Sequence, residues 1–233
     1  MSASIPADAG ANPVSASPVA IACFDVDRTL VRATSMERQF VQWLVAHGHL
    51  GPRALLWTAF SIAAGARASR RQGYVAYHGY LAGKRVEDVG EWAEACVADR
   101  VWPRVPRTAR YELTGHRADG RPVVLLSGSI RPLVDALARR LGADLVVASE
   151  PEADHGVYTG RLAGAHLAGP AKADTIRRLA LERGYDLSQS YGYADHHTDE
   201  AFLACFGHPR PANPDPRLQA IAASRGWPTV RFR

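Results

Sequence analysis

Two aspartates, Asp25 and Asp27, stand one residue apart in the segment Asp-Val-Asp-Arg-Thr and are the side chains best suited to chemistry. They follow an apolar run over 19–24 that has the length and composition of a buried strand. The acids therefore stand at the carboxyl end of a strand, where open α/β sheets bind ligands, and a shared site requires the chain to turn there. Carboxylates held close together repel each other, which favours a bound cation or a proton on one of them. The pair indicates a metal-assisted acid/base site.

A second candidate, Ser127, ends another apolar run over 122–126 and opens the segment Ser-Gly-Ser ahead of a predicted helix. Its hydroxyl and the backbone N–H groups after it suit an anion bound above the sheet. Gly128 allows the backbone to approach such a ligand closely. The alternative interpretation is an ordinary cap and turn for the helix that begins near residue 132.

Lys172 follows Gly169 and Pro170 in the first turn of a helix predicted over 170–183. A cation there opposes the helix dipole, which costs up to about 1 kcal/mol unless an anion lies nearby. The position therefore indicates an anionic neighbour. The alternative is an exposed lysine that extends into solvent.

Asp195 and Asp199 follow a strand predicted over 190–194, in the segment Ala-Asp-His-His-Thr-Asp-Glu. An acid is again placed at the carboxyl end of a strand, and a second acid four residues later is positioned to begin the next helix. His196 and His197 lie between them. Adjacent histidines point in different directions and no third ligand at a fixed spacing joins them, so the sequence does not favour zinc ligation there.

These candidates require a scaffold of alternating strands and helices. Strands are predicted over 19–24, 122–126, 145–148, 190–194 and 229–232, with a small hairpin around 157–162, and helices over 132–141, 170–183, 199–205 and 217–225. This alternation predicts an α/β fold with a parallel sheet wrapped by helices. Further helices are predicted over 36–47, 54–66, 70–81 and 86–101, so a helical block over 31–110 is inserted between the first strand and the second. The core domain would then comprise 19–30 and 111–233.

Composition limits the class of protein. The 233 residues, 47% of them hydrophobic, suffice for one α/β domain with an insertion. The net charge of +5 suits an anionic substrate, whereas scattered basic residues without interleaved aromatics do not favour nucleic-acid binding.

The chain also carries indications of its compartment. Three distant cysteines, Cys23, Cys96 and Cys205, indicate a reducing cytoplasm. Residues 1–18 lack the pattern of a secretion signal and are predicted to be a disordered tail. The longest apolar stretch, 54–66, is shorter than the roughly 20 residues that a membrane span needs.

In order along the chain, these groups resemble the four motifs of the haloacid dehalogenase superfamily of phosphohydrolases: Asp25-Val-Asp-Arg-Thr29, Ser127, Lys172, and Asp195 with Asp199. The insertion resembles the helical cap of the phosphoserine phosphatase-like branch. The C-terminal segment, with Gly207-His-Pro, Asn213-Pro-Asp-Pro and Arg225-Gly-Trp-Pro, is similar to that of a bacterial subgroup of capped hydrolases. The resemblance covers residues 19–232 and implies a Rossmann-like sheet with an inserted all-helical cap domain.

The resemblance also implies a two-step phosphoryl transfer. Asp25 would be the nucleophile that forms an aspartyl-phosphate, and Asp27 would protonate the leaving group and later activate water. Mg²⁺ would be bound by the Asp25 carboxylate, the Asp27 backbone carbonyl and the Asp195 carboxylate.

The remaining motif residues would support this chemistry. Ser127, Gly128 and Lys172 would bind the phosphoryl oxygens. Asp199 would support the site by orienting Lys172 or a metal-bound water.

The sequence departs from the family pattern near these motifs. Arg28 stands where a small or polar residue is frequent, Ala194 replaces a common glycine, and the histidine pair at 196 and 197 replaces small residues. None of these changes removes a group that the chemistry needs.

Substrate selectivity is expected to lie in the cap. Thr34 replaces the glutamate with which related phosphoserine phosphatases bind the substrate ammonium, and Glu37 is the nearest acid, so L-phosphoserine is disfavoured. Cap aromatics such as Trp43 either line a substrate pocket or, as we favour, form the cap core; the others are Trp57, Tyr74 and Tyr77.

We therefore expect a Mg²⁺-dependent, cytoplasmic phosphatase of a small organic phosphomonoester. Histidinol phosphate, sugar phosphates and lipid headgroup phosphates stay open as substrates, and the oligomeric state is open as well. The alternatives are a phosphotransferase to an acceptor other than water, and a catalytically silent binding or regulatory protein on the same fold. A dehalogenase is disfavoured because that chemistry needs neither Asp27 nor the metal.

Overall fold

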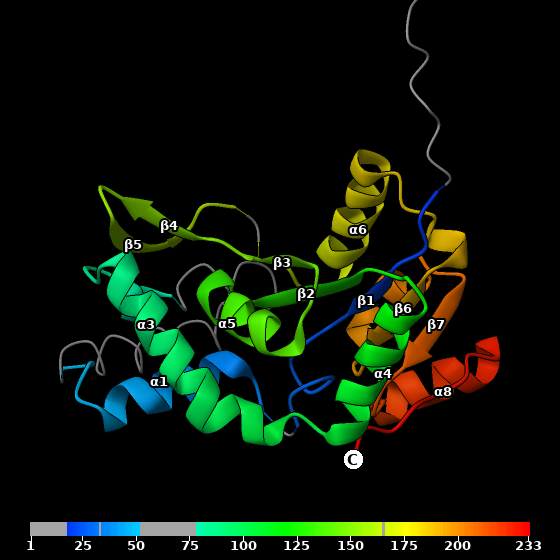
Figure 1. Ribbon diagram of the computed structural model, residues 1–233, viewed down its shortest axis with the longest axis horizontal. Helices are drawn as coiled ribbons and strands as arrows, with labels where there is room; N and C mark the ends of the chain where they lie inside the picture. The colour runs from blue at the N-terminus through cyan, green and yellow to red at the C-terminus, as the bar shows by residue number, and fades with distance from the viewer. Residues whose placement is uncertain (1–17, 33, 52–77, 165) are drawn as a thin grey trace, which may run out of the picture.

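Five parallel strands form the central sheet in the computed structural model of this protein, which describes residues 18–32, 34–51, 78–164 and 166–233 (Figure 1). Their order is β3-β2-β1-β6-β7, with β1 at Ala22–Phe24, β2 at Val123–Ile130, β3 at Leu145–Ser149, β6 at Tyr191–Ala194 and β7 at His208–Pro211. The chain runs outward from β1 to β3 on one side and then crosses to β6 and β7 on the other. The carboxyl ends of β1 and β6 therefore flank the point where the strand order reverses, which is where such sheets bind ligands.

Helices cover both faces of the sheet because successive strand residues point to opposite sides. Ala22 and Phe24 belong to one apolar cluster and Cys23 to the other. α4 (Arg107–Ala118) and α5 (Arg131–Leu141) pack into the first cluster; α6 (Pro170–Arg183), α7 (Glu200–Leu203) and α8 (Pro216–Arg225) pack into the second. This arrangement confirms the predicted α/β architecture.

The described part of the insertion between β1 and β2 contains helices and no strand of the sheet. It comprises α1 (Met36–Ala46), a 3₁₀ turn at Gly79–Leu81, and α3 (Val86–Cys96), which continues through a π turn at Val97–Val101 into a 3₁₀ turn at Trp102–Arg104. α1 begins where the Ser35 hydroxyl accepts a hydrogen bond from Arg38 N. The next helix, α4, spans residue 110, where the sequence placed the end of the insertion.

A β hairpin from a distant segment packs against the insertion. β4 (Pro151–Asp154) and β5 (Val157–Leu162) pair in antiparallel fashion and lie beside α3 at one end of the molecule (Figure 1). Gly83 N donates to Tyr158 O and Tyr158 N donates to Lys84 O, both at 2.9 Å. Gly160, at φ +85°, lies so close that a Cβ there would be 3.0 Å from that of Ala82. The hairpin therefore completes a structure that is otherwise helical.

One prediction about the sheet edge was wrong, and one strand there was missed. Residues 229–232 do not form a strand but contribute an isolated bridge between Val230 and Ala212. The fifth strand is instead β7, whose prolines obscured it, and prolines are tolerated there because β7 is an edge strand.

Three other predictions fall on residues 1–17 and 52–77, outside the described part of the chain. They are the disordered tail, the helix over 54–66 and most of the helix over 70–81. No helix among the described residues is long and apolar enough to cross a membrane.

Candidate active site

Asp25 and Asp195 meet at the carboxyl ends of β1 and β6, as the sequence predicted. Both residues are buried, and the Thr29 hydroxyl lies between their carboxylates, 2.8 Å from Asp25 Oδ2 and 3.3 Å from Asp195 Oδ1. Thr29 reaches this position because the chain turns after β1, with Leu30 N and Val31 N both donating to Val26 O. The turn that a shared site requires is therefore present.

Asp27 lies on the opposite side of the same turn, at the start of the insertion. Its Oδ1 accepts a hydrogen bond of 2.7 Å from Met36 N, the first residue of α1, and its Oδ2 accepts one of 2.7 Å from Ser129 Oγ. Burial and the nearby Asp25 carboxylate raise the pKa of Asp27 to about 6, although these hydrogen bonds lower it. Asp27 is thus rigidly held and titrates close to neutral pH.

Lys172 carries its charge into the middle of the site. Its Nζ lies 2.6 Å from Asp25 Oδ1 and 2.8 Å from Asp199 Oδ2, and its side chain is only 6% exposed. Burial lowers the pKa of Lys172, but the Asp25 and Asp199 carboxylates more than offset this and raise it above its ordinary value. The predicted anionic neighbours are present, so Lys172 is not a solvent-exposed lysine.

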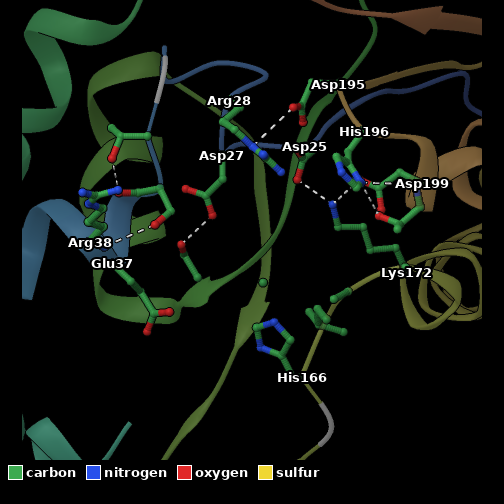
Figure 2. Close-up of a pocket in the computed structure, with 18 of the residues that line it drawn as sticks. Asp25, Asp27, Arg28, Glu37, Arg38, His166, Lys172, Asp195, His196 and Asp199 are labelled. Carbon is green, nitrogen blue, oxygen red and sulfur yellow. Dashed lines mark hydrogen bonds and ion pairs between the residues drawn. The ribbon is translucent and has the colours of Figure 1, made fainter. Parts of the chain in front are cut away.

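The site carries more negative than positive charge. Lys172 contacts the carboxylates of Asp25 and Asp199, and those of Asp27 and Asp195 lie near Asp25 (Figure 2). The other cation that contacts one of these four among the described residues is Arg28, whose Nε lies 3.4 Å from Asp195 Oδ2. The Arg28 side chain is 55% exposed, so solvent screens its charge. Burial and the Asp25 carboxylate raise the pKa of Asp195 to about 7. Buried excess charge with only oxygen donors fits a hard divalent cation such as Mg²⁺.

These groups open into a cleft of about 830 Å³ between the sheet and the insertion (Figure 2). The insertion contributes Thr34, Ser35, Glu37 and Arg38, and the core contributes Gly128, Ser129, the segment 166–170, His196 and Thr198 beside the charged residues described above. The cleft therefore has a charged floor formed by the core and a polar wall formed by the insertion.

Ser127 is fully buried, and its Oγ accepts a hydrogen bond of 3.0 Å from Ser129 N. It does not cap α5, whose N-cap residue is Ile130, but its contact with Ser129 N is the local turn contact of the alternative interpretation, and Ser127 itself does not border the cleft. Gly128 borders the cleft, and a Cβ there would lie 3.0 Å from the His166 ring and from Leu167 O. A Cβ at this position would therefore require its neighbours to shift by a few tenths of an ångström.

Sequence reasoning gave no role to Thr29 and missed Ser129, which hold the two aspartates of the first motif. Glu37, named from the sequence as the acid nearest Thr34, lines the cleft and accepts a 3.0 Å hydrogen bond from Tyr80 OH. Ser129 lies two residues beyond Ser127, a spacing that in a strand places both side chains on one face. Trp43 is a core residue, 5% exposed, as favoured from the sequence; Trp57, Tyr74 and Tyr77 lie outside the described residues.

Comparisons with known proteins point to one family. The model for haloacid dehalogenase-like hydrolases matches residues 22–204. The protein named inhibition of morphological differentiation protein of Streptomyces azureus is 35% identical over 221 residues, which cover 92% of this chain and 79% of that protein. A phosphoserine phosphatase of Mycobacterium tuberculosis is 31% identical over 225 residues, covering 92% and 71%. A crystal structure from Bordetella pertussis, of a protein with unknown function, has a TM-score of 0.80 at 26% identity and covers 92% of this chain and 99% of that one.

Proposed function

This chain belongs to the haloacid dehalogenase-like hydrolases, and from that membership we propose that it hydrolyses a small organic phosphomonoester, with Mg²⁺, through an aspartyl-phosphate on Asp25. One observation carries the proposal: the Asp25 carboxylate borders the cleft, is held by Lys172 and lies beside the Asp195 carboxylate. The activity belongs to the phosphatase class of its phosphoserine phosphatase relative.

Asp25 is the nucleophile in this proposal. Lys172 contacts one of its oxygens and Thr29 the other, so the carboxylate has a defined orientation toward the cleft. Attack forms a bond from a carboxylate oxygen to phosphorus as the bond from phosphorus to the leaving alkoxide breaks. Lys172 and the Gly128 backbone N–H border the cleft and would bind the phosphoryl oxygens and stabilise their charge, and the Ser127 hydroxyl, buried next to Gly128, would be a third donor to them.

Asp27 transfers the proton. A carboxyl group with a pKa of about 6 is partly protonated near neutral pH, so it can donate to the leaving alkoxide. The resulting carboxylate then accepts a proton from the water that hydrolyses the aspartyl-phosphate. Its hydrogen bonds to Met36 N and Ser129 Oγ hold it beside the cleft through both steps.

The metal-binding residues in this proposal are Asp25, Asp195 and the backbone carbonyl of Asp27. A bound Mg²⁺ would supply positive charge that offsets repulsion between the Asp25 carboxylate and the substrate phosphate. Asp199 acts through Lys172, because its carboxylate holds the ammonium group 2.8 Å away and directs it toward Asp25.

The insertion over 31–110 would act as a cap that selects the leaving group. Thr34, Glu37 and Arg38 face the cleft from it, which suits a polar organic phosphate of moderate size.

A cytoplasmic location stays part of the proposal and is supported by the three free thiols of Cys23, Cys96 and Cys205.

The proposal is tested with Asp25→Asn and p-nitrophenyl phosphate as substrate. We expect turnover to fall by at least about 10³-fold, because an amide cannot form the aspartyl-phosphate. Asp135→Asn is a matched control, since this partly exposed aspartate on α5 makes only an ion pair to Arg131 at 3.8 Å. Turnover by Asp25→Asn close to wild type, or wild-type turnover that is unchanged by removal of Mg²⁺, would contradict the proposal.

A further inference from the structure

We propose a second cation site in this protein, formed by His196, His197 and Asp215 and suited to Zn²⁺ or a similar divalent metal that prefers imidazole ligands. Asp215 was not among the candidate residues of the sequence, and its position supplies the third ligand that the histidine pair lacked. The inference is independent of the proposed phosphatase activity, because it concerns different donor atoms and is tested by binding.

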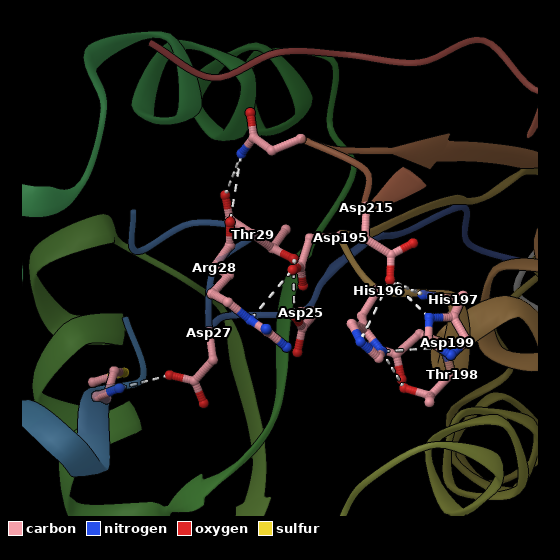
Figure 3. A network of polar contacts seen from close by, with 12 residues as sticks. Asp25, Asp27, Arg28, Thr29, Asp195, His196, His197, Thr198, Asp199 and Asp215 are labelled. Carbon is pink, nitrogen blue, oxygen red and sulfur yellow. Dashed lines mark hydrogen bonds and ion pairs between the residues drawn. The ribbon is translucent and has the colours of Figure 1, made fainter. Parts of the chain in front are cut away.

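The three side chains converge on a small volume (Figure 3). Asp215 Oδ2 lies 2.7 Å from His197 Nδ1 and 3.4 Å from His196 Nε2, and the three ligand atoms all lie within 4.8 Å of one another. Zinc bonds of about 2.0–2.2 Å in a tetrahedron place ligand atoms roughly 3.4 Å apart. A Zn²⁺ ion therefore fits between these atoms after side-chain shifts of less than about 1 Å.

Adjacent histidines converge here because the chain turns between them. A 3₁₀ turn at His197–Asp199 follows β6, and the two imidazole rings lie 4.2 Å apart with planes at 36°. In an extended strand their side chains would point to opposite faces. The local turn thus removes the objection that the sequence raised against this pair.

Asp215 is held with one oxygen directed toward the histidines. It is the N-cap of α8, where its Oδ1 accepts a 2.6 Å hydrogen bond from Leu218 N, and its own backbone N donates to Asp195 O at 2.8 Å. Capping uses Oδ1 and leaves Oδ2 directed toward the imidazoles, where it also accepts a long hydrogen bond of 3.4 Å from His197 N. The charged ligand of the site is therefore in place before a metal binds.

His196 Nδ1 faces Thr198, where it accepts a 3.3 Å hydrogen bond from Thr198 N and lies 2.9 Å from Thr198 Oγ1. In the neutral ring the proton is then on Nε2, toward Asp215. When Nε2 binds a metal, the proton moves to Nδ1, which then donates to Thr198 Oγ1. The three side chains are 23–30% exposed, so water can complete the coordination of an ion bound to them.

The donor chemistry separates this site from the oxygen cluster around Asp25. Two imidazole nitrogens and one carboxylate oxygen suit Zn²⁺, Co²⁺ or Ni²⁺, whereas Mg²⁺ prefers oxygen and keeps most of its water. Excess Mg²⁺ should therefore fill the oxygen site without displacing a zinc-class metal from the histidines.

The experiment is a calorimetric titration of the full chain with Zn²⁺ in excess Mg²⁺. We expect wild type to bind one Zn²⁺, and His197→Gln and Asp215→Asn to bind it at least about tenfold more weakly. Asparagine is itself a good N-cap, so Asp215→Asn preserves the start of α8, and unchanged melting temperatures would verify the fold. His155→Asn is the matched control, because the His155 side chain is 95% exposed and lies outside this cluster.

Cobalt provides a second readout. Co²⁺ bound to the histidine site in excess Mg²⁺ should give visible absorption characteristic of nitrogen ligation, and His197→Gln should abolish it while His155→Asn should not. Equal Zn²⁺ affinity in all four proteins, or displacement of Zn²⁺ by Mg²⁺ from wild type, would overturn the proposal.

Discussion

Two polar networks lie beside β6, one buried and one that extends from buried His116 to partly exposed Glu112, and they differ in how completely their charges are paired. The acid–lysine cluster consists of Asp25, Lys172, Asp195 and Asp199 at the carboxyl end of the sheet. The histidine–tyrosine network lies on one face of the same strand. There Arg121 Nε lies 2.8 Å from His116 Nδ1, His116 Nε2 lies 2.7 Å from Tyr193 OH, and Tyr193 OH lies 2.7 Å from Glu112 Oε1.

The histidine–tyrosine network is balanced. Arginine can only donate, so His116 Nδ1 accepts, Nε2 carries the ring proton toward Tyr193 OH, and the phenol donates to Glu112. Burial, together with Arg121, lowers the pKa of His116 to about 4, so the ring is neutral at physiological pH. The acid–lysine cluster instead keeps excess negative charge and borders the cleft. The difference teaches that buried charge without local compensation, at a cleft, distinguishes the candidate active site from a paired network that supports the fold.

The substitution with the largest expected effect, Lys172→Met, tests whether the acid–lysine cluster serves activity. Removal of the buried ammonium leaves Asp25 and Asp199 without their cation, so we expect activity to fall by about 10³-fold and stability by about 3 to 5 kcal/mol. Activity assays and urea unfolding at pH 7 measure the two effects. If activity persists, the lysine is structural and the distinction between the networks fails.

A second test separates proton transfer from nucleophilic attack by means of Asp27→Asn. For an alkyl phosphate, whose leaving group needs a proton, we expect kcat to fall by about 10²-fold or more. For p-nitrophenyl phosphate the loss should be smaller, because nitrophenolate leaves without protonation. Equal losses for both substrates would show that Asp27 does not act as the acid.

Tyr193→Phe tests whether the histidine–tyrosine network serves stability and not activity. Loss of the hydroxyl leaves the buried His116 ring N–H without its acceptor, so we expect a loss of about 1 to 3 kcal/mol in unfolding free energy. Activity should stay within about twofold of wild type when corrected for folded protein. Tyr191→Phe serves as control, since Tyr191 is only partly buried and stacks on His208. A large loss of kcat in Tyr193→Phe would mean that this network serves the reaction.

The smallest expected effect concerns how the unfolding free energy of the metal-free protein changes with pH. His116 and Asp195 should contribute slopes of opposite sign. His116 has a lowered folded pKa, so between about pH 4 and 6.5 the unfolded chain binds more protons and stability rises with pH. Asp195 has a raised folded pKa, so between pH 3.8 and about 7 the folded chain binds more protons and stability falls as pH rises. Each contributes at most about 1.4 kcal/mol per pH unit.

The two variants that isolate these contributions are His116→Gln and Asp195→Asn. Unfolding free energy between pH 4 and 6.5 should rise more steeply with pH in Asp195→Asn than in wild type, and less steeply in His116→Gln. The opposite ordering of slopes would contradict the assigned protonation states.

Much of the fold was predictable because its signals are local. The apolar run before Asp25 is strand β1, and the helix predicted over 170–183 is α6, with Pro170 at its start and Gly184 as its C-cap. Helix α4 was missed because its sequence is rich in arginine and polar residues, and it is held by a few apolar contacts such as Leu113. β7 was missed because alternating prolines do not resemble a strand, although an edge position accepts them.

By itself the sequence singled out the acids to which we assign the proposed chemistry, since acids placed directly after apolar strands must meet at one edge of a parallel sheet. It gave no sign that Thr29 lies between Asp25 and Asp195, that Ser129 holds Asp27, or that Asp215 reaches the histidine pair. Those contacts depend on the angle of a turn or the packing of a distant helix. Only the tertiary structure decides them, because each joins elements through geometry that no local pattern of residues encodes.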